Sequence, residues 1–433
     1  MLEVLDLRER GGRLEPSRLE IDPATTETVR QILQRVFVEG DDVLLELAER
    51  FDGCDLSGTG VLVADEEFAQ AERDTPPELR AAIDELIERL RDLSARQLPR
   101  EWWDERDGVR FGEVVRPLAS VGCYVPGGRA RYPSSVCMTV VPAVVAGVGE
   151  IVLCTPPQRD GSIHAAVLYA ARRAGATYVA KAGGAQAVAA MAYGTESIPA
   201  VDRIVGPGNV YVTEAKRQVA GFVGIDGLAG PSELAIVADG DVDARMAALD
   251  LVAQAEHDPE ARTFFLTPDP GLADRVVAEL DAALADAGRR EIVDQSIGHT
   301  KLVLVRDLDH AFATLNDVAA EHVLLLLDDP QAHLGKVRNA GAIFLGTWTA
   351  VPYGDYGVAS NHVLPTAGTS RFSSGLRASD YVTVSSVLEM SPEGARRFTP
   401  GTSAIARTEG LEGHAKAMDA RHDEAARRDG AGR

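Results

Sequence analysis

From about Glu113 onward, short apolar runs alternate with longer Ala-rich stretches, and this alternation constrains the fold more than any other feature. The first apolar runs occupy 121–125, 151–154, 178–180 and 204–205, and the helical segments that follow three of them occupy 163–174, 185–193 and 209–219. The alternation restarts after Gly230, with apolar runs at 234–237, 264–266, 302–305, 323–327 and 342–345. Strands that alternate with helices form parallel sheets covered on both faces. We therefore expect an α/β protein with two Rossmann-like parallel-sheet domains.

The chain has 433 residues, which is too long for one ordinary core, so several domains are expected. Residues 29–47 and 77–98 show helical apolar spacing with charged faces. Beyond about Ser370 the chain is polar and its pattern favours helix. The expected parts are a mostly helical N-terminal segment at 1–112, Rossmann-like domains at 113–230 and 231–369, and a helical C-terminal tail at 370–433.

Charge and cysteine content restrict the partners and the compartment. The formal charge of −22 disfavours binding to nucleic acid and to anionic membrane surfaces. The most apolar run, 136–149, is too short for a membrane span and contains Pro142. No signal peptide is expected, because no basic region leads into an apolar stretch at the N-terminus. Four cysteines without metal or redox spacing fit a reducing, cytoplasmic setting.

Two segments carry metal-ligand residue types about 100 residues apart. Gln254 and His257 are three apart on a predicted helix, so they share a face and could touch one zinc ion. Taken alone, His257 is better explained by the helix dipole. Asp355 follows a glycine in a polar loop, where turn chemistry is the other explanation.

Two further residue pairs could carry chemistry. Glu321 and His322 precede the apolar run 323–327, a placement suited to acid–base work or to simple strand-edge polarity. Glu409 and His414 are five apart, about 140° around a helix, so they could share a ligand only near a helix end. Otherwise both are surface residues.

Glycine-bearing loops follow three of the predicted strands, at 125–128, 182–186 and 206–209. Such loops let a backbone approach phosphates at helix N-termini. The loop Gly206-Pro207-Gly208 has the first two glycines of a dinucleotide fingerprint, but Tyr211 stands where the third should be. A nicotinamide cofactor is therefore allowed by the pattern and not demanded by it.

Together these segments closely resemble the histidinol dehydrogenase family, NAD-dependent enzymes of the last two steps of histidine biosynthesis. The matching strings run in order from Val121, with the last ending at His414. They are VGCYVPGG, YPSSV, GGAQAVAAMAYGTE, DRIVGPGN, YVTEAKR, GPSELAIVAD, AQAEHD, EHVLLL, GAIFLG, GDYG, NHVLPT, RFSSGL and EGLEGH.

The resemblance implies a role for each matched residue, and a homodimer in which the tail serves dimerisation. It implies one Zn²⁺ per subunit, NAD as oxidant and L-histidinol as the small-molecule substrate. The implied zinc ligands are Gln254, His257, Asp355 and His414. Glu321 and His322 match the catalytic pair, and the implied NAD contacts are Tyr124, Gln186 and Asn209. The implied substrate contacts are Ser232, His362 and Glu409, together with His322 and the zinc ligands.

Two other functions remain open on the sequence. A related branch could oxidise a different small polyol without zinc, although the retained zinc-type residues argue against it. The protein could instead be a non-catalytic zinc-binding or assembly protein, against which the retained Glu321-His322 pair argues. Activity toward histidinol separates these possibilities.

Overall fold

The computed structural model describes residues 3–9, 14–15, 17–127 and 131–431. The chain forms two compact units. Unit 1 comprises Met1–Gln97 and Leu118–Tyr381, and unit 2 comprises Leu98–Pro117 and Val382–Arg433. Each is described by itself below.

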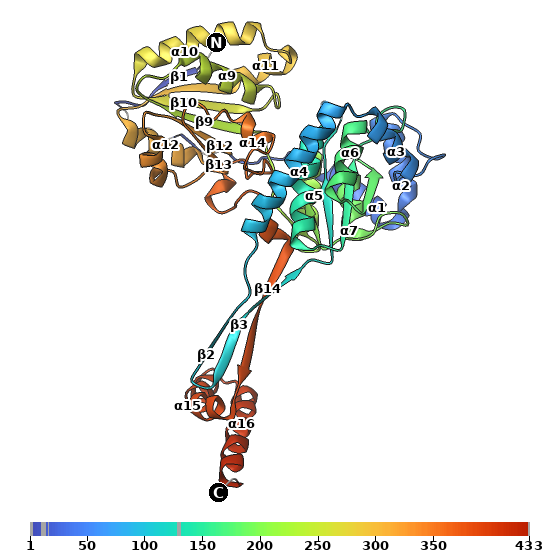
Figure 1. The fold of residues 1–433 in the computed structure, drawn as a ribbon, viewed down its shortest axis with the longest axis vertical. Coiled ribbons are helices and arrows are strands. Elements are labelled where there is room, and N and C mark those ends of the chain that lie inside the picture. The colour runs from blue at the N-terminus through green and yellow to red at the C-terminus, as the bar shows by residue number, and fades with distance from the viewer. Residues whose placement is uncertain (1–2, 10–13, 16, 128–130, 432–433) are drawn as a thin grey trace. The chain divides into compact units, whose positions relative to one another are not determined.

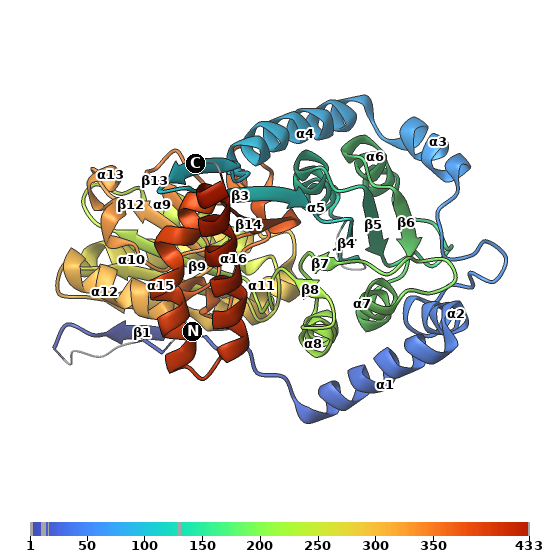
Figure 2. The same cartoon turned by 90° about the horizontal axis from the view of Figure 1, so that it is seen from below.

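The first sheet of unit 1 has five parallel strands in the order β6-β5-β4-β7-β8. Helices cover both of its faces, α1, α2, α7 and α8 on one and α4, α5 and α6 on the other (Figure 2). The strands are β4 (Ser120–Tyr124), β5 (Glu150–Thr155), β6 (Tyr178–Lys181), β7 (Arg203–Val205) and β8 (Gly224–Ile225). The helices are α1 (Pro23–Glu39), α2 (Asp41–Leu47), α3 (Asp65–Asp74), α4 (Pro77–Gln97), α5 (Pro133–Ala146), α6 (Ala165–Ala174), α7 (Gly184–Tyr193) and α8 (Val210–Val219), with a π-helical turn at Ala48–Asp52.

The second sheet of unit 1 has six parallel strands in the order β1-β11-β10-β9-β12-β13. Helices α9 and α10 pack on one face and α12 on the other (Figure 1). The strands are β1 (Glu3–Asp6), β9 (Glu233–Ala238), β10 (Arg262–Thr267), β11 (Thr300–Leu304), β12 (His322–Leu326) and β13 (Ala342–Leu345). The helices are α9 (Ala244–Ala255), α10 (Pro270–Ala285), α11 (Arg290–Ser296), α12 (Leu308–Val318), α13 (Pro330–His333) and α14 (Pro352–Asp355), with 3₁₀ turns at Ile297–His299, Leu334–Lys336, Thr369–Arg371 and Ala378–Tyr381.

Unit 2 is a three-stranded antiparallel sheet with two helices. The strand order is β14-β3-β2, from β2 (Trp102–Arg106), β3 (Val109–Pro117) and β14 (Val382–Met390). Helices α15 (Pro392–Thr408) and α16 (Glu412–Ala431) pack side by side (Figure 1).

The expected fold class is confirmed: there are two parallel sheets, each covered by helices, and apart from β1 their strands follow one another along the chain. The tail differs from the expectation of helix beyond Ser370, because β14 precedes its two helices. Strands β1, β2 and β3 were also not predicted in the N-terminal segment. The division of the chain at residues 112, 230 and 369 stays a prediction.

One predicted helix, 29–47, is split at Gly40. Helix α1 begins at an N-cap, where the Asp22 carboxylate accepts a 2.9 Å hydrogen bond from the Thr25 N–H, with Pro23 in the first turn. It ends at Gly40, whose φ of 61° a residue with a side chain rarely adopts. The chain then starts α2 in a new direction, which apolar spacing alone did not indicate.

A buried carboxyl in α9 gives a pH-dependent stability prediction. Burial raises the pKa of Asp250 to about 6, opposed by a hydrogen bond from the Val351 backbone N–H. Because the folded-state pKa is raised, the stability linked to this group is present below pH 4 and is lost as the pH rises through 6. Asp250→Asn should therefore increase the free energy of unfolding at pH 8 by about 1–2 kcal/mol.

Urea unfolding at pH 8 and at pH 4.5 measures this effect. The gain should shrink at pH 4.5, because protonated Asp250 is already neutral there. The exposed Asp281 is the matched control in α10, and Asp281→Asn should change stability by less than about 0.5 kcal/mol. An equal gain for Asp250→Asn at both pH values would contradict the ionisation argument.

Among the described residues, no helix is both long and apolar enough to cross a membrane.

Candidate active site

A cluster of polar side chains lies at the amino edge of the six-stranded sheet. β9 and β12 are neighbouring parallel strands, and they start at Glu233 and His322. Ser232 and Glu321 directly precede these strands. Helix α9 runs back from β9, so its C-terminal end returns to the same edge. In open α/β sheets ligands usually bind at the carboxyl edge, so this placement is unusual for the fold.

The orientation of the His322 ring follows from one hydrogen bond. Its Nδ1 lies 3.1 Å from the backbone carbonyl oxygen of Glu233, and a carbonyl can only accept. Nδ1 therefore carries the proton, and Nε2 keeps a lone pair. Nε2 lies 3.8 Å from Oδ1 of Asp355. Burial lowers the pKa of His322 to about 4, so the ring is neutral at pH 7 and able to accept a proton.

Glu321 is buried beside this ring. Its Oε2 accepts a 3.1 Å hydrogen bond from the Glu233 N–H and lies 3.5 Å from His322 Nδ1. Burial raises the pKa of Glu321 well above its usual value, and the neighbouring Glu233 and Asp355 carboxylates add to the rise. The nearby Ser232 side chain lowers the pKa of this carboxyl slightly. A carboxyl with a raised pKa is a stronger base once it is ionised.

Asp355, at the end of α14, lies between two imidazoles. Its Oδ2 is 3.7 Å from Nε2 of His257, and its Oδ1 is 3.8 Å from Nε2 of His322. These distances are too long for hydrogen bonds. Two ligands of one tetrahedral zinc ion, each about 2.1 Å from it, are about 3.4 Å apart. The spacing of His257 and Asp355 is close to that value, so the pair fits a shared ion better than a direct contact.

Gln254, like the His257–Asp355 pair, has a polar group that lacks a direct protein partner. It lies in the last turn of α9, its side chain is buried, and its Nε2 has no hydrogen-bond partner among the described residues. Rotation of the amide would present the oxygen at that position, where a metal could bind it. The structure thus has three side chains suited to a divalent ion, the Gln254 amide and the His257–Asp355 pair.

These residues do not complete a metal site by themselves. Across residues 3–9, 14–15, 17–127 and 131–431, no group of three or more His, Cys, Asp or Glu side chains is close enough to hold a metal ion. Gln254 is of another residue type, and His414 belongs to unit 2. Glu409 directly follows α15 and His414 is in α16, so a turn separates them and both are exposed. The expectation that Glu409 and His414 lie about 140° apart on one helix was therefore wrong.

His362 connects the loop after α14 to the first sheet's helices. Its Nδ1–H donates a 2.7 Å hydrogen bond to the backbone oxygen of Asp355, and its Nε2 accepts one of 2.9 Å from the Ser135 hydroxyl. Burial lowers the pKa of His362, which keeps the ring neutral. Asn361 Nδ2 donates to the Met138 carbonyl oxygen at 2.7 Å, so this loop and α5 are held together at two adjacent residues.

The implied cofactor contacts lie at the carboxyl edge of the five-stranded sheet. Tyr124 ends β4, Gln186 is in the first turns of α7, and Asn209 caps α8. The Tyr124 hydroxyl accepts a 3.1 Å hydrogen bond from the Gly184 N–H, and Asn209 Oδ1 accepts from two N–H groups of α8. Helix N-termini at this edge favour a phosphate, so the residues fit a dinucleotide.

Two of the loop glycines have a simpler explanation. A Cβ at Gly127 or Gly183 would lie 2.6 Å from atoms of Pro156, so close packing already requires glycine there. Gly128, the last residue of the first glycine-bearing loop, lies outside the described residues.

Reasoning from the sequence missed two contributors to the cluster. Glu233 supplies backbone groups to both Glu321 and His322, and Ser135 orients His362. Both lie inside strings that match the family, GPSELAIVAD and YPSSV, which was the available signal. Their contacts join residues far apart in the sequence, so no local pattern indicates them.

Comparison with known proteins identifies the family of the chain. Residues 17–422 match the family model described as histidinol dehydrogenase. The chain is 47% identical over 395 residues to the histidinol dehydrogenase of Halalkalibacterium halodurans, covering 91% of this chain and 93% of that one. It is 45% identical over 426 residues to that of Moorella thermoacetica, covering 98% and 100%.

A solved structure shares the whole fold. The crystal structure of histidinol dehydrogenase from Elizabethkingia anophelis superposes with a TM-score of 0.94 at 30% identity, covering 98% of each chain. The chain is therefore an oxidoreductase that belongs to the histidinol dehydrogenase family.

Proposed function

We propose that the protein oxidises L-histidinol to L-histidine through L-histidinal, using NAD, in histidine biosynthesis. Membership of the family over residues 17–422 supports the reaction. The observation that carries the site assignment is the neutral His322, whose unprotonated Nε2 faces Asp355. The proposed roles are Glu321 and His322 as the catalytic pair, and Ser232 and His362 as substrate contacts together with Glu409.

In the first oxidation, His322 Nε2 takes the proton of the substrate hydroxyl. The ring is suited to this because burial keeps it neutral and the Glu233 carbonyl holds the proton on the other nitrogen. The Glu233 N–H fixes the carboxyl of Glu321 beside it. Such a positioned base contributes about 10²–10⁴-fold to the rate.

In the second oxidation, Glu321 takes a proton from water as the water oxygen adds to the aldehyde carbon, and protonated His322 returns its proton to the aldehyde oxygen. The neutral His322 then takes a hydroxyl proton from the hydrate as the same carbon gives up its remaining hydride, and the acid forms. Burial of Glu321 and His322 limits the water that reaches these two side chains.

Two bound groups would supply the chemistry that side chains lack. NAD, contacted by Tyr124, Gln186 and Asn209, would accept one hydride in each oxidation, and one zinc ion per subunit would bind the substrate and polarise its carbinol. The proposed zinc ligands are Gln254, His257 and Asp355, with His414 as the fourth. The unpartnered Gln254 amide and the His257–Asp355 spacing support this assignment.

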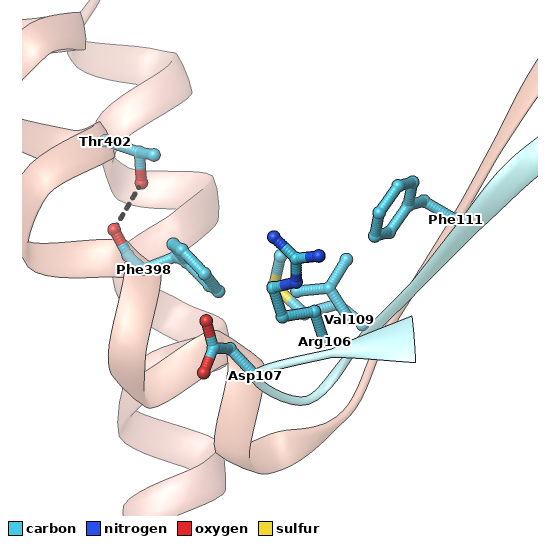
Figure 3. Close-up of a pocket in the computed structure, with 7 residues that line it drawn as sticks. Arg106, Asp107, Val109, Phe111, Phe398 and Thr402 are labelled. Atoms are coloured by element: carbon cyan, nitrogen blue, oxygen red, sulfur yellow. Dashed lines mark hydrogen bonds between the residues drawn. The ribbon is translucent and has the colours of Figure 1, made fainter. Parts of the chain in front are cut away.

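The proposal includes a homodimer that shares its active sites. Unit 2 leaves large apolar side chains exposed, among them Leu388 (67%) and Ile405 (61%). A pocket of about 330 Å³ opens between β2, β3, β14 and α15, where Arg106 lies between Phe111 and Phe398 (Figure 3). Apolar surface of this kind marks a protein interface, and exchanged elements form closed two-fold dimers at low cost.

A cytoplasmic location is also part of the proposal. The four cysteines Cys54, Cys123, Cys137 and Cys154 are all free and buried. Free thiols persist in a reducing compartment.

One assay tests the reaction. The purified protein with L-histidinol and NAD should form two NADH per histidinol consumed, with little free histidinal, measured by absorbance and by product analysis. Chelation should abolish the activity and added zinc should restore it. Small polyols without an imidazole are the matched controls and should give little NADH. Faster oxidation of one of these polyols, or no NADH from histidinol, would contradict the proposal.

A further inference from the structure

A buried ion pair beside the proposed cofactor loops has no role in the mechanism above. Lys216 of α8 pairs with Asp226, which directly follows β8, and their side chains are only 3% and 9% exposed. Taking two charges out of water is costly unless further hydrogen bonds satisfy them. The groups that hydrogen-bond to Lys216 and Asp226 therefore indicate which part of the chain the pair holds in place.

The pair binds both polar groups of one residue, Gly206. Lys216 Nζ donates to the Gly206 carbonyl oxygen at 3.1 Å, and Asp226 Oδ2 accepts from the Gly206 N–H at 2.7 Å. Asp226 Oδ1 also accepts from the Gly227 N–H at 2.7 Å. A helix and an edge strand thus converge on the point where β7 ends.

Gly206 has no side chain with which to hold its own conformation. Its φ is 113°, and a Cβ there would lie 2.1 Å from the backbone oxygen of Tyr124. Glycine has more conformational freedom to lose than any other residue, so external contacts must fix it. From Gly206 the chain reaches Asn209, which is held in turn by its capping bonds to α8.

We propose that the Lys216–Asp226 pair is a positioning element for the cofactor, which fixes the loop 206–209 so that Asn209 and Tyr124 meet NAD in one geometry. The inference rests on the proposed NAD dependence and deepens it. A loop that is already ordered binds without losing further conformational freedom. The pair should therefore act on NAD affinity and leave the acid–base steps at Glu321 and His322 unchanged.

The test uses Lys216→Met, which keeps side-chain length while removing the donor to Gly206. A second variant, Lys216→Met with Asp226→Asn, removes both charges and retains an acceptor for the Gly206 N–H. In both, the KM for NAD and the Kd for NADH should rise on the order of tenfold. The kcat at saturating NAD and the KM for histidinol should stay within about twofold of wild type.

Arg217→Met is the matched control. Arg217 is the next residue of α8, and it pairs at 2.7 Å with the buried Glu214 instead of with the loop. This variant should leave both NAD constants unchanged. Two outcomes would overturn the proposal, because in each the pair would serve stability alone. One is a lower melting temperature with an unchanged KM for NAD in the Lys216 variants. The other is loss of the fold in both Lys216 variants.

Fluorescence titration with NADH separates this inference from the proposed function, because it needs no turnover. If the wild-type protein binds NADH but forms none from histidinol, the proposed reaction fails while the effect of Lys216 on binding can still be measured. If the wild-type protein does not bind NADH, the inference itself fails.

Discussion

His322→Asn is expected to lower the kcat for histidinol oxidation by about 10²–10⁴-fold, because the asparagine cannot take the hydroxyl proton. In wild type, Nε2 is the unprotonated nitrogen and faces Asp355, since Nδ1–H donates to the Glu233 carbonyl. Glu321→Gln should behave differently. It should slow oxidation of supplied histidinal, where water must be activated, far more than it slows the first oxidation.

Single-turnover measurements with histidinol and with histidinal separate the two steps. NADH binding in both variants is the control, because neither residue is near the proposed cofactor loops in the sequence or on the same sheet edge. Equal losses in both oxidations for Glu321→Gln would refute the division of roles.

Mixed subunits should reveal whether the metal site is shared between protomers. His257→Ala and His414→Ala should each be inactive, because each removes a proposed zinc ligand. In an equal mixture of the two variants refolded together, half of the dimers are heterodimers. Each heterodimer has one intact site and one site with both lesions, so about a quarter of wild-type activity should return.

The matched control mixes His257→Ala with Asp355→Ala. Both residues come from unit 1 and lie 3.7 Å apart, so every site of that heterodimer carries one lesion and no activity should return. Recovery in neither mixture, with heterodimers demonstrated by native mass spectrometry, would mean that each subunit builds its own site. Bound zinc measured on the same samples should follow the activity.

The alternating α/β architecture could be predicted because its signals are local. Each strand of the parallel sheets is a short apolar run, and each following helix repeats its apolar residues every three to four positions. The predicted runs 121–125, 151–154 and 234–237 therefore fall on β4, β5 and β9 within a residue or two. The identities of the candidate site residues came from the ordered family strings, since no single motif distinguished them from ordinary surface or turn residues.

Strands that pair with distant segments gave no such signal. β1 joins β11 about 300 residues away, and β14 pairs with β3 although Leu118–Tyr381 lies between them in the chain. Every residue of β14 is exposed or half-buried, so the strand has no buried face that a hydrophobic pattern could reveal. Its Val and Thr residues favour a strand, but the segment alone does not indicate its pairing partner.

The sequence by itself determined the alternation of strands and helices in the two parallel-sheet regions, the family, and which residue types were available for chemistry. Only the tertiary structure decided that Glu321, His322, Asp355 and His257 meet at the amino edge of one sheet, and that Glu233 assigns the proton of His322. The reason is that backbone preferences act over a few residues, whereas a site is made by contacts between residues that can be more than 200 positions apart. Those contacts are fixed by how the sheet and its helices pack, and no local pattern encodes them.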